Sequence, residues 1–331
     1  MAPRKPSRYS QPMTGMPAFL DRMRPAVPDL VVPRGILPFI LSRHPVRGRL
    51  VRLGPLAEAL IGRHRHHSVV AILAGQALAL VAGLASSLRF SGSFSLQVKG
   101  DGPVSVLQAD CTETGALRFY ARVQQDRLAA ALEPASAPAA DVLFGQGYLA
   151  FTVDPGAGRD RHQGIVALSG KSLEEMALAY FRESMQIAGV VRLAAARGPE
   201  GWRAGAMILE RIASAGGQIP VAAREQQAEA WRTAAALAAT LSDAELLDDR
   251  LGSEELLFRL FRSEGVLAEP PRSLAFGCRC TRARLSGILE SFGGEDLDQM
   301  TTDGAILMTC EFCNLDFRFA RAEIAGRDPT D

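Results

Sequence analysis

Alternating apolar and polar residues in the first two thirds of the chain predict the strands of a β-sheet. In residues 94–99 (FSLQVK) every second side chain is apolar, as expected of a strand with one buried face. A turn at residues 100–103 and apolar stretches at 104–109 and 117–123 would complete a three-stranded meander. The same pattern predicts further strands at residues 46–53, 147–153, 164–168 and 204–212.

Helical spacing and a capping motif predict helices among these strands. Residues 56–61 place their apolar side chains at helical spacing. Ser172 and Glu175 match a capping box, in which each side chain satisfies a backbone donor of the other residue. We expect the helix that starts there to run to Met185. Together with the strands, these helices predict an α+β fold for the N-terminal domain.

Residues 69–88 form an almost entirely apolar stretch of twenty residues, long enough to span a bilayer. The stretch is rich in alanine and is interrupted by Gly75-Gln76, Gly83 and Ser86-Ser87, which weakens it as a membrane anchor. An all-round apolar helix can instead lie in a protein core. We therefore expect a buried helix here rather than a transmembrane one.

The pattern changes after residue 220. Residues 221–265 are rich in Ala, Glu, Arg and Leu, show no strand pattern, and contain a second capping box at Ser242-Asp243-Ala244-Glu245. Ser253 is expected to cap a helix over residues 254–261, which carries apolar residues on one face: Leu256, Leu257, Leu260 and Phe261. We interpret this segment as a helical linker, closed by Pro270-Pro271, whose apolar face must rest on another part of the chain.

Four of the five cysteines form two short pairs near the C-terminus: Cys278-Arg279-Cys280 and Cys310-Glu311-Phe312-Cys313, with 29 residues between the pairs. Four thiolates at this spacing predict a tetrahedral metal site, most readily filled by one zinc ion. A helix over residues 281–290 and strands at 305–309 and 315–319 would surround the site. Fewer than sixty residues make a poor independent core, so a crosslinking metal would stabilise this module.

Composition and charge narrow the class of protein. The chain has 331 residues, 47% of them hydrophobic and 22% charged, and a net charge of +1. This balance calls for neither a nucleic-acid nor a membrane partner. Five clustered cysteines are too few for a secreted disulfide scaffold, and we find no signal peptide, so we expect a cytoplasmic protein.

These patterns divide the chain into four predicted parts. Residues 1–30, rich in Pro and Arg, are expected to be a disordered extension. Residues 31–220 would form the N-terminal α+β domain, residues 221–272 the helical linker, and residues 273–331 the zinc module.

The cysteine site alone leaves several functions open. A purely structural zinc site is the commonest role of four cysteines. A zinc ribbon that binds nucleic acid is disfavoured because acidic residues outnumber basic ones between residues 278 and 325. A thiol-disulfide oxidoreductase would place its C-x-x-C at the start of a helix in a βαβ unit, whereas this motif lies between two predicted strands.

A redox switch is the fourth possibility. Zinc would tie Cys278 and Cys280 to Cys310 and Cys313, whereas disulfides formed within each pair would close no long loop. Replacing the zinc by two local disulfides would remove the module's long-range crosslink. The module would then unfold, the adjoining helices would be released, and apolar surface would be exposed.

The chain resembles the redox-regulated bacterial chaperone family called heat shock protein 33 from about residue 45 to 325. The cysteine motifs and the residues next to them match the family pattern: Phe276-Gly277-Cys278-Arg279-Cys280 and Cys310-Glu311-Phe312-Cys313-Asn314. Family-like stretches elsewhere are Val46-Arg47-Gly48, Leu88-Arg89-Phe90-Ser91-Gly92, Gly100-Asp101-Gly102-Pro103, Tyr120-Ala121-Arg122-Val123, Gly145-Gln146-Gly147-Tyr148-Leu149, Gln163-Gly164-Ile165-Val166, Tyr180-Phe181-Arg182-Glu183-Ser184 and Glu255-Leu256-Leu257-Phe258-Arg259-Leu260. The chain departs from the family at His162, where a tyrosine is usual, and around Met185.

The resemblance implies a holdase that needs no ATP and is not an enzyme. Cys278, Cys280, Cys310 and Cys313 would bind one zinc ion in the reduced, inactive state. Oxidation would pair Cys278 with Cys280 and Cys310 with Cys313, and would expel the zinc. The linker would then unfold, the protein would dimerise through its first domain, and unfolding client proteins would be held.

Three other groups of residues are assigned no function. Cys111 is expected to be a small buried side chain. His64, His66 and His67 stand beside arginines and are expected to form a solvated helix end. Residues 100–103 lack the lysine and the following helix of a phosphate-binding loop, so we expect a hairpin turn.

Overall fold

The computed structural model describes residues 26–88, 90–133, 137–156, 158–212 and 221–325. Most of the predicted N-terminal extension therefore lies outside the described residues. The chain forms two compact units, and the larger one comprises Pro28–Cys278. The smaller one contains the chain from Arg279 onward. The mixed content of helices and strands confirms the predicted α+β fold.

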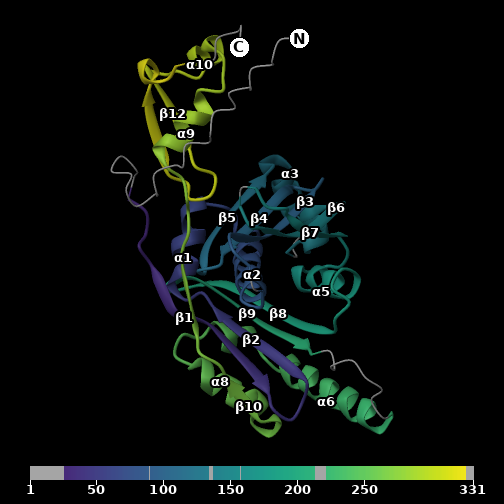
Figure 1. Ribbon diagram of the computed structural model, residues 1–331. Helices are drawn as coiled ribbons and strands as arrows, with labels where there is room; N and C mark the ends of the chain where they lie inside the picture. The colour runs from purple at the N-terminus through teal and green to yellow at the C-terminus, as the bar shows by residue number, and fades with distance from the viewer. Residues whose placement is uncertain (1–25, 89, 134–136, 157, 213–220, 326–331) are drawn as a thin grey trace, which may run out of the picture. The chain divides into compact units, whose positions relative to one another are not determined.

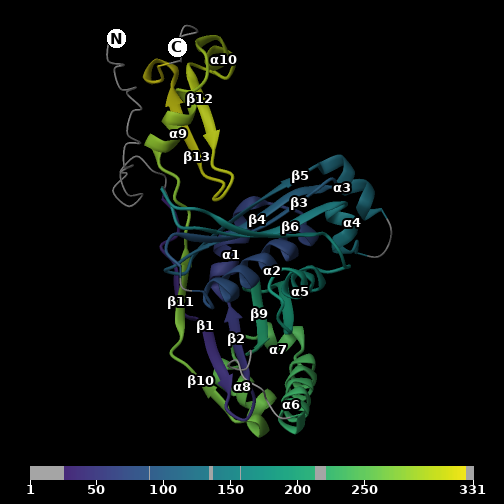
Figure 2. The ribbon, with the colours of Figure 1, turned by 45° about the vertical axis from the view of Figure 1, so that its right-hand side comes forward.

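A single mixed sheet organises the larger unit, and its strands follow the order β7-β6-β3-β4-β5-β11-β1-β2-β9-β8, with β10 paired to β1. Figure 1 labels β7 and β8 at the two ends of this order, and Figure 2 labels the strands between them. Every neighbouring pair is antiparallel except β5 and β11. The strands are β1 Val31–Leu41, β2 Val46–Arg52, β3 Ser93–Gly100, β4 Val104–Thr112, β5 Ala116–Val123, β6 Gly147–Asp154, β7 His162–Ala167, β8 Gly189–Gly198, β9 Gly201–Arg211, β10 Val266–Ala268 and β11 Arg272–Phe276.

Helix α2, Ser68–Ala85, lies in the core of this unit (Figure 1). Among the described helices it alone is long and apolar enough to cross a membrane by length and composition, and 78% of it is buried inside the fold. It packs with side chains of β2, β4 and β9 in one hydrophobic cluster. The prediction of a buried helix is confirmed. The other helices of this part are α1 Pro55–Ile61, η2 Gly62–His64, α3 Gln125–Leu132, α4 Ala140–Phe144 and α5 Leu173–Glu183.

The predicted linker is helical and packs on the face of β1, β2 and β9 that is opposite to the main hydrophobic cluster. It contains α6 Val221–Ala239, α7 Asp243–Leu247, α8 Ser253–Phe261 and η3 Arg262–Glu264. The four apolar residues predicted to share one face of α8 are all buried, in a second cluster with strand residues such as Leu37, Phe39 and Leu209. The rings of Phe39 and Phe261 are 5.6 Å apart. Strands β1, β2 and β9 are therefore buried on both faces.

The two capping boxes have different outcomes. At Ser242 both hydrogen bonds of the box are present. At Ser172 the hydroxyl accepts from the amide of Glu175, but the Glu175 carboxylate accepts from the amide of Lys171, one residue before the cap. The prediction for Ser253 was wrong by one residue, because Gly252 is the cap and Ser253 begins α8.

The predicted linker also ends in strand structure that the sequence pattern did not indicate. Strand β10 lies within residues 221–272, and β11 crosses the predicted boundary between residues 272 and 273. The division into four domains remains a prediction.

The smaller unit consists of α9 Arg282–Leu289, α10 Gly294–Gln299, the hairpin of β12 Ala305–Thr309 and β13 Asp316–Ala320, and η4 Arg321–Glu323. A small set of buried apolar side chains holds it together: Leu285, Leu289, Leu297, Ile306, Phe317, Phe319 and Ile324. This is a thin core for a unit of its length.

Candidate metal centre

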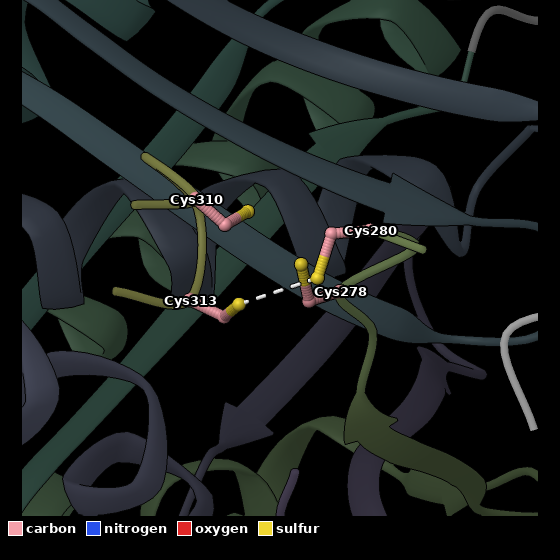
Figure 3. Close-up of side chains that lie close together, drawn as sticks. All are labelled: Cys278, Cys280, Cys310 and Cys313. Atoms are coloured by element: carbon pink, nitrogen blue, oxygen red, sulfur yellow. Dashed lines mark hydrogen bonds between the residues drawn. The ribbon is translucent and has the colours of Figure 1, made fainter. Parts of the chain in front are cut away.

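Four cysteine side chains converge on one point (Figure 3). The sulfurs of Cys278, Cys280, Cys310 and Cys313 all lie within 4.8 Å of one another, and all four residues are buried. The Sγ atoms of Cys280 and Cys313, which belong to different motifs, are 3.5 Å apart. The structure therefore brings together all four residues that the sequence spacing selected.

The first motif is positioned by the strand before it and the helix after it. Cys278 follows β11 by one residue, Gly277, whose amide donates to the carbonyl of Leu117 over 2.7 Å. A Cβ atom on Gly277 would lie 2.6 Å from the backbone carbon of Ala116, so only glycine fits this approach. Cys280 precedes Thr281, which caps α9 by accepting a hydrogen bond from the amide of Arg284 over 3.1 Å.

The second motif forms the tip of the β12–β13 hairpin. The amide of Cys310 donates to the carbonyl of Leu315 over 2.9 Å, and the amide of Asn314 donates to the carbonyl of Cys310 over 2.8 Å. Asn314 has a φ of 51°, a left-handed conformation that asparagine tolerates better than most residues. These bonds reverse the chain so that Cys310 and Cys313 face the same point.

The geometry and the donor atoms fit a tetrahedral thiolate-bound metal. With metal–sulfur bonds of about 2.3 Å, the sulfurs of such a site are roughly 3.8 Å apart. The observed upper limit of 4.8 Å and the 3.5 Å contact bracket that spacing. Four buried thiolates would repel one another, and a divalent cation offsets that repulsion. An all-sulfur set selects zinc or another soft metal.

Two arginines connect the segments around the hairpin, a role that the sequence reasoning did not assign to them. The guanidinium of Arg282 lies 4.3 Å from the ring centroid of Phe319, donates to the carbonyl of Arg318 over 2.6 Å, and pairs with Glu323. Arg321 pairs with Asp298 over 2.6 Å. The sequence gave little reason to assign this role, because most arginines lie on the surface with their charge in solvent.

Cys111 lies on β4 in the larger unit and is 2% exposed, as predicted. Burial, and then the negative charge of Asp110, raise the pKa of the Cys111 thiol to about 12. Asp110 itself is buried and pairs with Arg118 over 2.6 Å. Because the thiolate is the reactive form, Cys111 is an inert side chain at neutral pH.

The histidine group differs from its predicted solvated state. The rings of His64 and His66 stack with centroids 5.5 Å apart, and His64 also lies 4.4 Å from the ring of Phe119. Burial lowers the pKa of His66. Only His67 behaves as a polar helix end, because its Nδ1 accepts from the amide of Val69.

Residues 101–103 form the predicted turn between β3 and β4. The Asp101 carboxylate accepts from the amide of Gln146 over 2.8 Å, and the amide of Gly102 donates to the carbonyl of Phe144 over 2.8 Å. These groups are occupied in holding the turn against a neighbouring loop.

Comparison with known proteins relates most of the chain, cysteine motifs included, to one protein family. The family model described as Hsp33 protein matches residues 35–320. A "33 kDa chaperonin" of Caulobacter vibrioides is 36% identical over 296 residues, covering 86% of this chain and 96% of the relative. A "33 kDa chaperonin" of Pseudomonas fluorescens is 33% identical over 289 residues, covering 87% and 91%.

A solved structure shares the fold. The crystal structure of a 33 kDa chaperonin (heat shock protein 33 homolog) from Thermotoga maritima has a TM-score of 0.69, with 20% sequence identity. The match covers 88% of this chain and 96% of that chain.

Proposed function

The chain belongs to the Hsp33 protein family, and from this premise we propose that it is a redox-regulated chaperone that needs no ATP. In this role it holds unfolding client proteins and prevents their aggregation, and it catalyses no reaction of its own. The observation that carries the proposal is the buried cluster of four sulfurs, contributed by two cysteine pairs with 29 residues between them.

In the reduced state, Cys278, Cys280, Cys310 and Cys313 bind one zinc ion as thiolates. The ion links the C-x-C motif before α9 to the tip of the β12–β13 hairpin, which supplements the thin apolar core of the smaller unit. Zinc binding contributes about 10–16 kcal/mol to the folding of comparable peptides. The zinc-bound chain is the inactive form.

Oxidation removes this crosslink. One molecule of hydrogen peroxide takes two electrons from two thiolates, an S–S bond forms, the O–O bond breaks, and two protons from solvent complete two water molecules. Two such steps convert the site into two disulfides and release the zinc. Because all four sulfurs lie within 4.8 Å of one another, several pairings are within reach. We assign Cys278 with Cys280 and Cys310 with Cys313, the pairing that the family resemblance implies.

Loss of the crosslink unfolds the smaller unit and then the linker helices. The linker covers an apolar face formed by β1, β2 and β9, in which Leu37, Phe39 and Leu209 are buried. Its release uncovers that face and the apolar side of α8, and both gain the capacity to bind unfolded chains. The oxidised protein dimerises through the first domain.

The proposed setting is the bacterial cytoplasm, where a reducing environment keeps the thiolates on the metal until oxidative stress. The clients are unfolding proteins. Neither a nucleic acid nor a membrane takes part.

The proposal is tested by treating the zinc-loaded chain with peroxide at elevated temperature. Zinc release is followed with a chromogenic chelator, and light scattering of heat-unfolded citrate synthase is followed in parallel. We expect zinc release and suppression of scattering to rise together, and reductant plus zinc to reverse both. If zinc is retained and the client aggregates, the site is a structural one.

The same samples distinguish a chaperone from a thiol-disulfide oxidoreductase. A holdase suppresses aggregation only near a stoichiometric ratio to the client. Multiple turnovers of a disulfide substrate at substoichiometric amounts of the chain would instead favour the oxidoreductase.

A further inference from the structure

Strand β11 joins two halves of the large sheet. It lies between β5, to which it is parallel, and β1, to which it is antiparallel (Figure 2). Without β11, the sheet would end at β5 on one side and at β1 on the other. The strand that fills this place is also the segment that leads from the linker into the C-x-C motif, because Cys278 follows Phe276 after a single residue.

The place occupied by β11 is shaped for an extended backbone with one apolar side chain. The amides of Ala275 and Phe276 donate to the carbonyls of Gly115 and Leu30 over 3.0 and 3.1 Å, on opposite sides of the strand. Leu274 is fully buried in the main core. A Cβ atom on Gly35 of β1 would lie 2.7 Å from the Leu274 side chain, so the neighbouring strand leaves room for that side chain.

The same place opens into a cavity of about 780 Å³ at the start of β11. Pro271, Arg272 and Ser273 line one part of it. Apolar side chains line another part: Ile36, Leu88 and Phe90. A longer or bulkier extended segment would therefore find additional apolar surface beside the strand.

Burial of one side chain and short strand pairing fix β11 in the sheet. Of its five residues only Leu274 is buried, whereas Arg272 and Ser273 are exposed. It makes only two register pairs with β5. Its C-terminal end is fixed through Cys278, so loss of the metal crosslink removes the anchor closest to the strand. Opening of the linker frees the other end.

We propose that β11 vacates its place when the chain is oxidised, and that an extended segment of an unfolding client takes its place as an added strand between β5 and β1. This inference rests on the proposed function and specifies how that function binds its substrate. Main-chain hydrogen bonds give such pairing little dependence on sequence, and the Leu274 site and the adjacent cavity select apolar side chains. An unfolded protein supplies both features.

Hydrogen exchange on the full chain tests the inference. Exchange is measured by mass spectrometry for the reduced zinc-loaded chain, for the peroxide-oxidised chain, and for the oxidised chain holding heat-unfolded citrate synthase. We expect residues 272–277 to exchange about tenfold faster or more after oxidation. Residues 31–36 and 115–117 should lose protection with them and regain it when the client is bound.

A pair of variants supplies an independent test. Leu274→Asp places a carboxylate where the Leu274 side chain is buried in the main core, and should expel β11 from the sheet. The reduced chain should then suppress light scattering by the client while its zinc stays bound. Ser273→Asp adds the same charge one residue away, where the side chain is exposed, and should still require oxidant. If Leu274→Asp does not fold, the exchange experiment decides.

The outcomes separate this inference from the proposed function. If the oxidised chain suppresses aggregation while residues 272–277 stay protected, or if the client restores no protection at β1 and β5, the chaperone role stands and the strand-replacement inference is overturned. If the oxidised chain does not suppress aggregation, both are overturned.

Discussion

Each cysteine of the cluster depends on a neighbouring residue that fixes its backbone. Gly277 allows the chain to pass close to β5, Thr281 caps the helix after Cys280, and Asn314 adopts the left-handed conformation that closes the hairpin tip. Their hydrogen bonds hold four sulfurs at metal-binding distances. The site is thus a property of two backbone turns as much as of four thiols.

Replacing a cysteine of the cluster should uncouple chaperone activity from oxidation. Cys278→Ser and Cys310→Ser each remove one thiolate, and we expect zinc affinity to fall by more than about 100-fold, since even outer-shell changes cost about 10–100-fold. Chelator competition measures the affinity, and client scattering without oxidant measures the activity.

Cys111→Ala is the matched control, because this thiol is buried on β4 and its pKa is about 12. The control should bind zinc and respond to peroxide as the unmodified chain does. Tight zinc binding and normal switching in the Cys278→Ser and Cys310→Ser variants would contradict the assignment of the ligands.

The cysteines could be identified from the sequence because few roles suit two closely spaced pairs. Arg282 and Arg321 could not, because their partners come from segments as far as 41 residues away and only the folded chain brings them together. The pairing of His64 with the ring of Phe119 was missed for the same reason.

At the scale of elements, a strictly alternating strand was the easiest to predict, β2 and β9 were predicted although both of their faces are buried, and β1 and β8 were missed. β3 alternates strictly and was predicted almost to its ends. β1 was missed because Ile36 packs in the main hydrophobic cluster on one face while Leu37 and its neighbours pack against the linker on the other, so the strand does not alternate regularly. In addition, Pro33 and Pro38 resemble strand breaks. A register irregularity between Val32 and Ile36 accommodates the first of these prolines.

Strand β11 was missed for a different reason. Its five residues directly follow Pro270-Pro271 and hold a single buried side chain, Leu274, so no periodicity could be recognised. Its place in the sheet depends on β1 and β5, which are distant in sequence. Only tertiary pairing makes this segment a strand.

The packing of helix α8 on the sheet should determine how readily the linker unfolds. Phe261 is fully buried against Phe39, so Phe261→Ala should destabilise the packed linker by about 3–5 kcal/mol. The linker of the reduced chain should then become protease-sensitive at lower temperature, and less oxidant should be needed for activity. Limited proteolysis across residues 221–265 measures the opening.

Phe258 provides the control on the same helix, since it is 60% exposed. Phe258→Ala should change stability by no more than about 0.5 kcal/mol. Equal effects of the two substitutions would show that the packing of α8 on the sheet does not govern the opening.

At the scale of the molecule, the two compact units differ in how they are stabilised. The larger unit has two extensive hydrophobic clusters, whereas the smaller unit has few buried apolar side chains and three of the four clustered cysteines. Their stabilities should therefore respond differently to metal.

Removing the metal from the reduced chain should unfold the smaller unit and loosen the linker, while the sheet and the core helices of the larger unit stay folded. Calorimetry of the zinc-loaded chain should show an unfolding transition that a chelator abolishes, while the main transition of the larger unit stays within a few degrees. The reason is that zinc binding free energy is folding free energy for a module with so small a core. A cooperative transition of the smaller unit that survives full zinc removal would contradict this.

The position of β11 also has a consequence for synthesis of the protein. The residue paired with Val31 is Ala275, so the β1 strand edge cannot be closed until most of the chain has been made. At about 5–20 residues per second, a ribosome needs roughly 12–50 s to make the intervening chain. Once β5 has been made, a nascent molecule presents two open sheet edges until β11 follows. Each newly made copy of this protein therefore passes through a stage in which it resembles the aggregation-prone chains that its family protects.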